Sequence, residues 1–129
     1  MTRFVKGYIN DAGTDIILLD DVVFKAGSTT HVDLEVKITP KPGTMAILMS
    51  RTSAALKGLC VAMCPIDPDY CGNVSGIVHN ISNDTIVYKA GEAFCQFVIL
   101  KTEVYEGTEQ IEVKKQGFRN RGKFGSTGI

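Results

Sequence analysis

The alternation of apolar and polar residues restricts the fold of this chain more than any other feature of its sequence. In the segment HVDLEVKI, residues 31–38, every second residue is apolar and every intervening residue is polar or charged. A period of two is typical of a β-strand that has one buried face and one solvent-facing side. The expected buried face holds Val32, Leu34, Val36 and Ile38.

Similar short apolar runs recur along the chain, and turn-forming segments such as KAG, KPG, SNDT and YEGT separate them. Many short strands at this spacing predict an all-β barrel or sandwich. The further runs that we interpret as strands are residues 15–19, 44–49, 76–78, 86–88, 94–100 and 111–113.

One segment, SRTSAALKGL at residues 50–59, departs from the alternating pattern. Ser50, Thr52 and Ser53 are residue types that cap helix N-termini, and the alanines and leucine that follow favour a helix. Gly58 is the expected C-terminal stop. We therefore expect one short helix in an otherwise β domain.

Composition excludes several classes of protein. A chain of 129 residues with 44% hydrophobic residues suits one globular domain. Its 14 basic and 14 acidic residues give no net charge, which argues against broad coating of nucleic acid, although a local anion site stays open. No run reaches the ~18 apolar residues of a membrane span, and no signal region begins the chain.

The four cysteines, Cys60, Cys64, Cys71 and Cys95, lack the paired spacing of a zinc site, so we expect no zinc. Free buried thiols in a reducing, cytoplasmic setting are the expectation. Cations gather near the C-terminus, where the segment from residue 116 onward is expected to be flexible and separate from a β domain at residues 1–115.

Two segments have residue types suited to phosphate chemistry. MSRTSA, residues 49–54, combines Arg51 with two hydroxyls at an expected helix start, which favours an anion. PIDPDYCGNVSGIVHN, residues 65–80, places Asp67 at the end of an apolar run, where a carboxylate can act as a general base. Ordinary helix capping and an ordinary β-hairpin explain the same residues, so these segments alone leave both interpretations open.

Three other segments add polar groups to this pattern. NDAGTDI, residues 10–16, places Asp15 after a glycine turn, and AGEAFCQF, residues 90–97, holds Gln96 among apolar neighbours. The tail RGKFGSTGI carries one aromatic residue, Phe124, between glycines and hydroxyl residues. Such a tail could close over a polyphosphate as a lid, with Phe124 stacked on a base. A P-loop is excluded, because GxxxxGK[ST] is absent.

Taken in order, five segments resemble the motifs of the trimeric dUTP diphosphatase (dUTPase) family, and the compact chain with short loops resembles its viral and phage members. AGTDI is similar to the first motif, SRTSA to the second, IDPDYCGNV to the third, GEAFCQF to the fourth and RNRGKFGSTG to the fifth. The resemblance covers nearly the whole chain, from about residue 10. It implies a jelly-roll-like β-barrel, a homotrimer with active sites between subunits, and hydrolysis of dUTP to dUMP and pyrophosphate with Mg²⁺ on the triphosphate. Through that reaction the family limits uracil incorporation into DNA.

The resemblance also implies a role for individual residues. Asp67 would activate the water that attacks the α-phosphorus, and Asp15 would anchor metal-bound water without binding the metal directly. The sugar and uracil would contact Tyr70, Gly72, Asn73, Val74, Gly76, Ile77 and Phe124. The phosphates would contact Arg51, Thr52, Ser53, Gln96, Arg119, Gly125, Ser126 and Thr127.

Some residues depart from the family pattern. Thr52 stands where a serine is usual, Cys64 and Lys123 stand at glycine positions, Pro65 removes a backbone donor, and Cys71 replaces an arginine or glutamine. None removes a catalytic group.

Two other functions are compatible with part of this pattern. dCTP deaminases resemble the same fold but use a glutamate in the third-motif strand, and no glutamate lies between Tyr70 and Gly91. A dUTPase-like protein could instead act as a nucleotide-gated regulatory binder of another protein, and the sequence leaves that role open.

Overall fold

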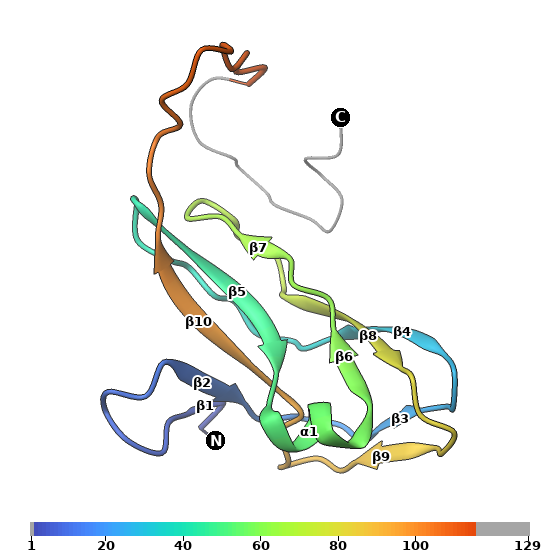
Figure 1. Ribbon diagram of the computed structural model, residues 1–129. Helices are drawn as coiled ribbons and strands as arrows, with labels where there is room; N and C mark the ends of the chain where they lie inside the picture. The colour runs from blue at the N-terminus through green and yellow to red at the C-terminus, as the bar shows by residue number, and fades with distance from the viewer. Residues whose placement is uncertain (1, 116–129) are drawn as a thin grey trace.

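The computed structural model describes residues 2–115, which form a mostly β domain with one short helix (Figure 1). Most strands are short, as the spacing of the turn segments predicts. The elements in chain order are β1 (Phe4–Val5), β2 (Gly13–Ile16), β3 (Val22–Phe24), β4 (Thr29–Asp33), β5 (Thr44–Ser50), α1 (Thr52–Lys57), β6 (Leu59–Val61), β7 (Pro65–Ile66), β8 (Ser75–Asn80), β9 (Ile86–Tyr88) and β10 (Cys95–Lys101).

The strands form three sheets. The first has five strands in the order β1-β2-β10-β5-β7, the second pairs β3 with β9, and the third has the order β4-β8-β6. Figure 1 shows β5 and β10 along one side of the molecule and β6, β8 and β4 along the other. The core lies between them and includes Phe24 and Phe94, whose rings meet edge to face at 5.1 Å. Within residues 2–115 these sheets do not close into a barrel.

The antiparallel pair of β5 and β10 is the longest in the domain. It aligns seven residue pairs, from Cys95 opposite Ser50 to Lys101 opposite Thr44. In β5, buried Thr44, Ala46 and Leu48 alternate with residues that stay partly exposed, as a strand with one core-facing side requires. This pair fixes where the segments on either side of it lie, and both of those segments contribute to the pocket described below.

Helix α1 follows β5 directly. Its N-cap is Arg51, which makes no side-chain capping hydrogen bond, so the prediction of a Ser or Thr cap is wrong. Ser50 instead bridges to β6: its hydroxyl donates to Leu59 O at 2.9 Å and accepts from Val61 N at 3.0 Å. The prediction that Gly58 ends the helix is confirmed, because Gly58 has φ 104° and its N–H bonds to the last turn. Helix α1 has six residues, and no helix within residues 2–115 is long and apolar enough to cross a membrane.

Three other expectations need correction. The predicted strand at residues 111–113 is wrong, because Ile111 and Val113 are exposed and pair with no strand within residues 2–115. The alternating burial of residues 31–38 is confirmed, but the paired strand β4 ends at Asp33. The four cysteines form no disulfide, as expected, yet only Cys95 is buried.

Candidate active site

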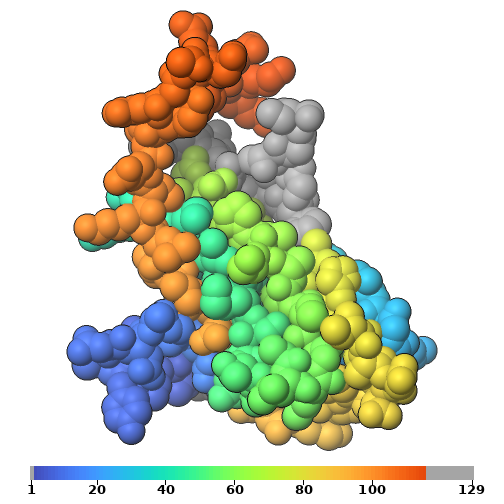
Figure 2. All heavy atoms as spheres, in the orientation of Figure 1, coloured from blue at the N-terminus to red at the C-terminus, as the bar shows by residue number. Residues whose placement is uncertain are grey.

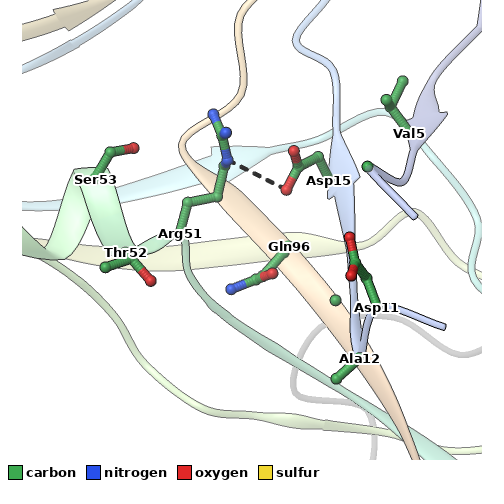
Figure 3. A pocket seen from close by; sticks show the side chains of 10 residues that line it. Val5, Asp11, Ala12, Asp15, Arg51, Thr52, Ser53 and Gln96 are labelled. Carbon is green, nitrogen blue, oxygen red and sulfur yellow. Dashed lines mark ion pairs between the residues drawn. The ribbon is translucent and has the colours of Figure 1, made fainter. Parts of the chain in front are cut away.

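A polar cavity of about 390 Å³ lies where β2, the start of α1 and the start of β10 meet (Figure 3). Three of the segments singled out in the sequence contribute to it, although Asp15 and Gln96, for example, are 81 residues apart in the chain. Its wall consists of Val5, Gly7, Asp11, Ala12, Gly13, Asp15, Arg51, Thr52, Ser53 and Gln96.

Strand pairing brings the polar groups of this cavity together. Asp15 of β2 lies directly opposite Gln96 of β10, so both side chains leave the sheet on the same face. On the other side of β10, Gln96 lies opposite Met49 of β5, and Arg51 follows two residues later. Gln96 donates from Nε2 to Ser50 O at 3.1 Å, which holds its amide beside the end of β5.

Arg51 is held from three directions. Its Nε lies 3.2 Å from Asp15 Oδ1, one terminal N–H donates to Ala93 O at 3.0 Å, and its backbone N–H donates to Phe94 O at 3.0 Å (Figure 3). A guanidinium has five N–H donors, so at least three remain for a ligand after these two side-chain contacts. Because Arg51 and Asp15 are both partly exposed, the ion pair lies at the opening of the cavity and a ligand can reach it.

Two hydroxyl residues complete this side of the cavity. Thr52 and Ser53 are the first two residues of α1 and both are exposed. With the Arg51 guanidinium and the Gln96 amide they offer a compact set of hydrogen-bond donors, which is the chemistry that phosphate oxygens require. The cavity also holds the carboxylates of Asp11 and Asp15, so a strongly anionic ligand would need a counter-ion there.

A second group of the sequence-predicted residues lies elsewhere, in the connection from β7 to β8. Tyr70 packs partly against the core, donates its hydroxyl to Asn73 O at 2.9 Å, and donates its backbone N–H to Asp67 O at 3.1 Å. Val74 is buried and exchanges backbone hydrogen bonds with the segment after β4, donating to Val36 O at 2.8 Å. These contacts fix the loop that holds Asp67 and Gly72, and Gly76 and Ile77 follow it within β8.

Within one chain the two groups do not meet. Ile66 of β7 pairs with Ala46 of β5, whereas the cavity lies beyond Ser50, four residues further along β5. At the ~3.3 Å rise of a strand, this offset is about 13 Å, and the chain turns away from the cavity after Ile66. Asp67 consequently lines no part of the cavity.

The structure adds residues that the sequence interpretation missed. Val5, Gly7, Asp11, Ala12 and Gly13 line the cavity, and no periodicity or spacing indicated the first three. Ala12 and Gly13 belong to AGTDI, a segment that the sequence pattern singled out for Asp15 and not for these two residues. The predicted tail residues Arg119, Phe124, Gly125, Ser126 and Thr127 lie outside the described residues.

No group of three or more His, Cys, Asp or Glu side chains in residues 2–115 could hold a metal ion. One carboxylate of the cavity, that of Asp15, is already paired with Arg51. The donor set therefore suits a metal ion that arrives with its own oxygen ligands, as a phosphate-bound Mg²⁺ does, more than a metal bound by protein alone.

Known proteins resemble this chain along nearly its whole length. The family model described as dUTPase matches residues 2–128. A deoxyuridine 5'-triphosphate nucleotidohydrolase of Hydrogenobaculum sp. is 34% identical over 92% of this chain and 84% of its own length.

Two solved structures extend the comparison to the fold. A native dUTPase of EIAV is 25% identical, with a TM-score of 0.74 over 89% of this chain and 94% of that one. The Staphylococcus bacteriophage 80alpha dUTPase, as a G164S mutant with dUpNHpp, is 20% identical and shares the fold. Its TM-score is 0.75 over 99% of this chain and 92% of that one.

Proposed function

The chain belongs to the dUTPase family, and from this premise we propose that it hydrolyses dUTP to dUMP and pyrophosphate at a site built from two subunits or more. The observation that carries the proposal is the meeting of Asp15, Arg51 and Gln96, from three separate motifs, in one polar cavity. Water would attack the α-phosphorus, the bond to the oxygen that bridges the α- and β-phosphates would break, and pyrophosphate would leave.

The cavity is the proposed phosphate site. Arg51 is oriented by Asp15 and by Ala93 O before any ligand arrives, so its remaining N–H groups need little reorganisation to meet phosphate oxygens. Gln96, Thr52 and Ser53 add neutral donors beside it. Fixed donors of this kind stabilise charge that develops on the leaving pyrophosphate, which is the main requirement of phosphoryl chemistry.

Asp67 is the proposed general base, which takes a proton from the attacking water. The fixed loop that follows it and the start of β8 would supply the rest of the nucleoside site: Tyr70 would pack on the deoxyribose, and the backbone from Gly72 to Ile77 would contact the uracil edge. Rigidity supports this assignment, because the Tyr70–Asn73 and Val74–Val36 hydrogen bonds hold the loop before ligand arrives.

A homotrimer would join the two groups. The outer face of the five-stranded sheet carries partly exposed Met45, Ile47, Met49, Val98 and Leu100, which are neighbours across β5 and β10. This apolar face is continuous with the cavity, because Gln96 lies opposite Met49 on it, so a second copy that packs there would lie beside Arg51 and could supply its own Asp67.

The segment after β10 supports the same assembly. Residues 102–115 extend from the end of β10 away from the sheets (Figure 2) and expose Val104, Tyr105, Ile111 and Val113. Apolar side chains on an extended segment gain stability when they pack on another subunit.

Mg²⁺ is the proposed cofactor and would reach the site bound to the triphosphate. When bound, it neutralises phosphate charge and orients the chain of phosphates for in-line attack. Asp15, from its position in the cavity, would hold water on the metal. Arg119, Phe124, Gly125, Ser126 and Thr127 are proposed to cover the bound nucleotide as a lid at residues 116–129. Cysteines without disulfides suit a reducing compartment, and we propose that the enzyme acts in the cytoplasm.

The experiment that tests this function measures pyrophosphate release from dUTP, dTTP, dCTP and UTP, each with Mg²⁺ and with EDTA. We expect strong preference for dUTP and dependence on Mg²⁺. Equal use of dTTP or UTP would contradict the assignment of the nucleoside site.

A further inference from the structure

Gly13 lies beneath the side chain of Gln96. The two residues are diagonal neighbours, because Gln96 pairs with Asp15 and Gly13 lies two residues before Asp15 on the same face of β2. A Cβ atom built on Gly13 would lie 1.8 Å from Gln96 Oε1 and 2.7 Å from its Cδ. No side chain fits there while Gln96 keeps its position.

Backbone conformation does not explain this glycine. The glycines with positive φ among the described residues are Gly27, Gly43, Gly58 and Gly91, and Gly13 is not one of them. Gly13 is an ordinary strand residue, for which any side chain could adopt the backbone angles. What the position requires is space, and the space is filled by the Gln96 amide.

We infer that Gly13 is a positioning residue for phosphate binding: the absence of a side chain at Gly13 leaves space for Gln96 Oε1, so that Gln96 Nε2 donates one N–H to Ser50 O and keeps the other for a ligand. This inference rests on the proposed function for its effect on catalysis. Its structural part, that the position of Gln96 depends on Gly13, concerns a single chain and does not depend on the proposed activity.

A methyl group at position 13 would collide with the end of the Gln96 side chain, and this determines its expected effect. The atoms that a Cβ would meet belong to the end of a flexible side chain, so Gln96 can rotate away without displacement of the strands. Rotation would break the hydrogen bond to Ser50 O and move the amide relative to Arg51 and Asp15. Gly13→Ala should therefore change catalysis far more than stability.

The test is a cycle of Gly13→Ala, Gln96→Ala and the double variant, with Thr14→Ser as a control on the other face of the same strand. We expect each single variant to lower kcat for dUTP by roughly 10- to 100-fold, as misplaced catalytic donors do. The double variant should match Gln96→Ala within about twofold, since the methyl then meets no amide. Affinity for dUpNHpp should fall in the same variants, whereas affinity for deoxyuridine, which lacks phosphates, should not change.

A structural readout separates this inference from the proposed function. The side-chain amide signal of Gln96 in a ¹⁵N–¹H spectrum, assigned by its loss in Gln96→Ala, should shift in Gly13→Ala and stay in place in Thr14→Ser. If Gly13→Ala unfolds, the double variant should fold, because Gln96→Ala removes the obstruction. An unmoved amide signal, or losses of activity that add in the double variant, would overturn the inference whether or not the wild-type chain cleaves dUTP.

Discussion

Arg51 and Asp15 form an ion pair, with Arg51 Nε 3.2 Å from Asp15 Oδ1, and this pair joins the end of β5 to β2 at the opening of the cavity. An exposed ion pair contributes little to stability on its own. Its importance is geometric, because it fixes the direction of a guanidinium that keeps at least three donors for a ligand.

Replacement of Asp15 by asparagine should release Arg51 without disturbing the fold. We expect kcat/KM for dUTP to fall by about 10- to 100-fold, because a mobile arginine no longer meets the phosphates in a fixed position. The thermal midpoint should change little, since the pair is exposed. Asp21→Asn, which removes a surface carboxylate paired with Lys89 away from the cavity, is the matched control and should leave kinetics unchanged. Unaltered kinetics in Asp15→Asn would show that Arg51 needs no such support.

Replacement of Asp67 by asparagine should separate chemistry from binding. Loss of a general base lowers turnover by about 10²- to 10⁴-fold, and the amide keeps the shape of the carboxylate. Calorimetric titration with dUpNHpp should therefore give an affinity close to that of the wild type, while pyrophosphate release nearly stops. Turnover near the wild-type rate would remove Asp67 from its proposed role.

The thiol of Cys95 should resist alkylation in the folded protein. Burial, with a smaller effect from the negative charge of Asp15, raises the pKa of this thiol to about 12, so almost no reactive thiolate forms near neutral pH. Cys60 and Cys71 are exposed and should react with iodoacetamide first. Mass spectrometry of peptides after brief labelling, with and without urea, measures the order; early modification of Cys95 in the native protein would contradict its burial.

The Asp20–Glu35 pair should make stability depend on pH. A hydrogen bond to the Asp20 side chain and the charge of Asp20 raise the pKa of Glu35 above its ordinary value. The folded state therefore binds this proton more tightly than the unfolded chain does, and stability is lost as pH rises through the folded pKa. Relative to the wild type, Glu35→Gln should be more stable at about pH 7 than at about pH 4.

Urea unfolding of both proteins at the two pH values measures this difference. The glutamine shares the positive φ of 54° at position 35, so backbone strain cancels in the comparison. A difference between the two proteins that does not change with pH would exclude the Asp20–Glu35 pair as its source.

Most strands and the helix were predictable from the sequence, but the residues at which they begin and end were not. Alternation in residues 31–38 and 44–49 identified core-facing segments because burial on one side of a strand imposes a period of two. The same reasoning failed for residues 111–113, where apolar residues are exposed in the isolated chain. The local sequence pattern indicates that one face of a segment is apolar, whereas the three-dimensional fold determines whether that face is covered.

In the site, too, the sequence predicted individual residues but not how they come together. The motifs identified Asp15, Arg51 and Gln96, but their meeting depends on the register of β2, β10 and β5, which no local pattern specifies. Gly13 illustrates the gap most clearly: a glycine in a strand predicts a bulge or a close approach, and the approach of the Gln96 amide is visible only in the structure.

The most direct measurement of the shared site mixes two inactive variants, Arg51→Ala and Asp67→Asn, by unfolding and refolding them together in equal amounts. If each site takes Arg51 from one subunit and Asp67 from another, every mixed trimer holds one intact site, and about a quarter of wild-type dUTP hydrolysis should return. Each variant refolded alone should stay inactive. If the mixture of correctly assembled oligomers regains no activity above the two variants measured separately, Arg51 and Asp67 do not act together across a subunit interface.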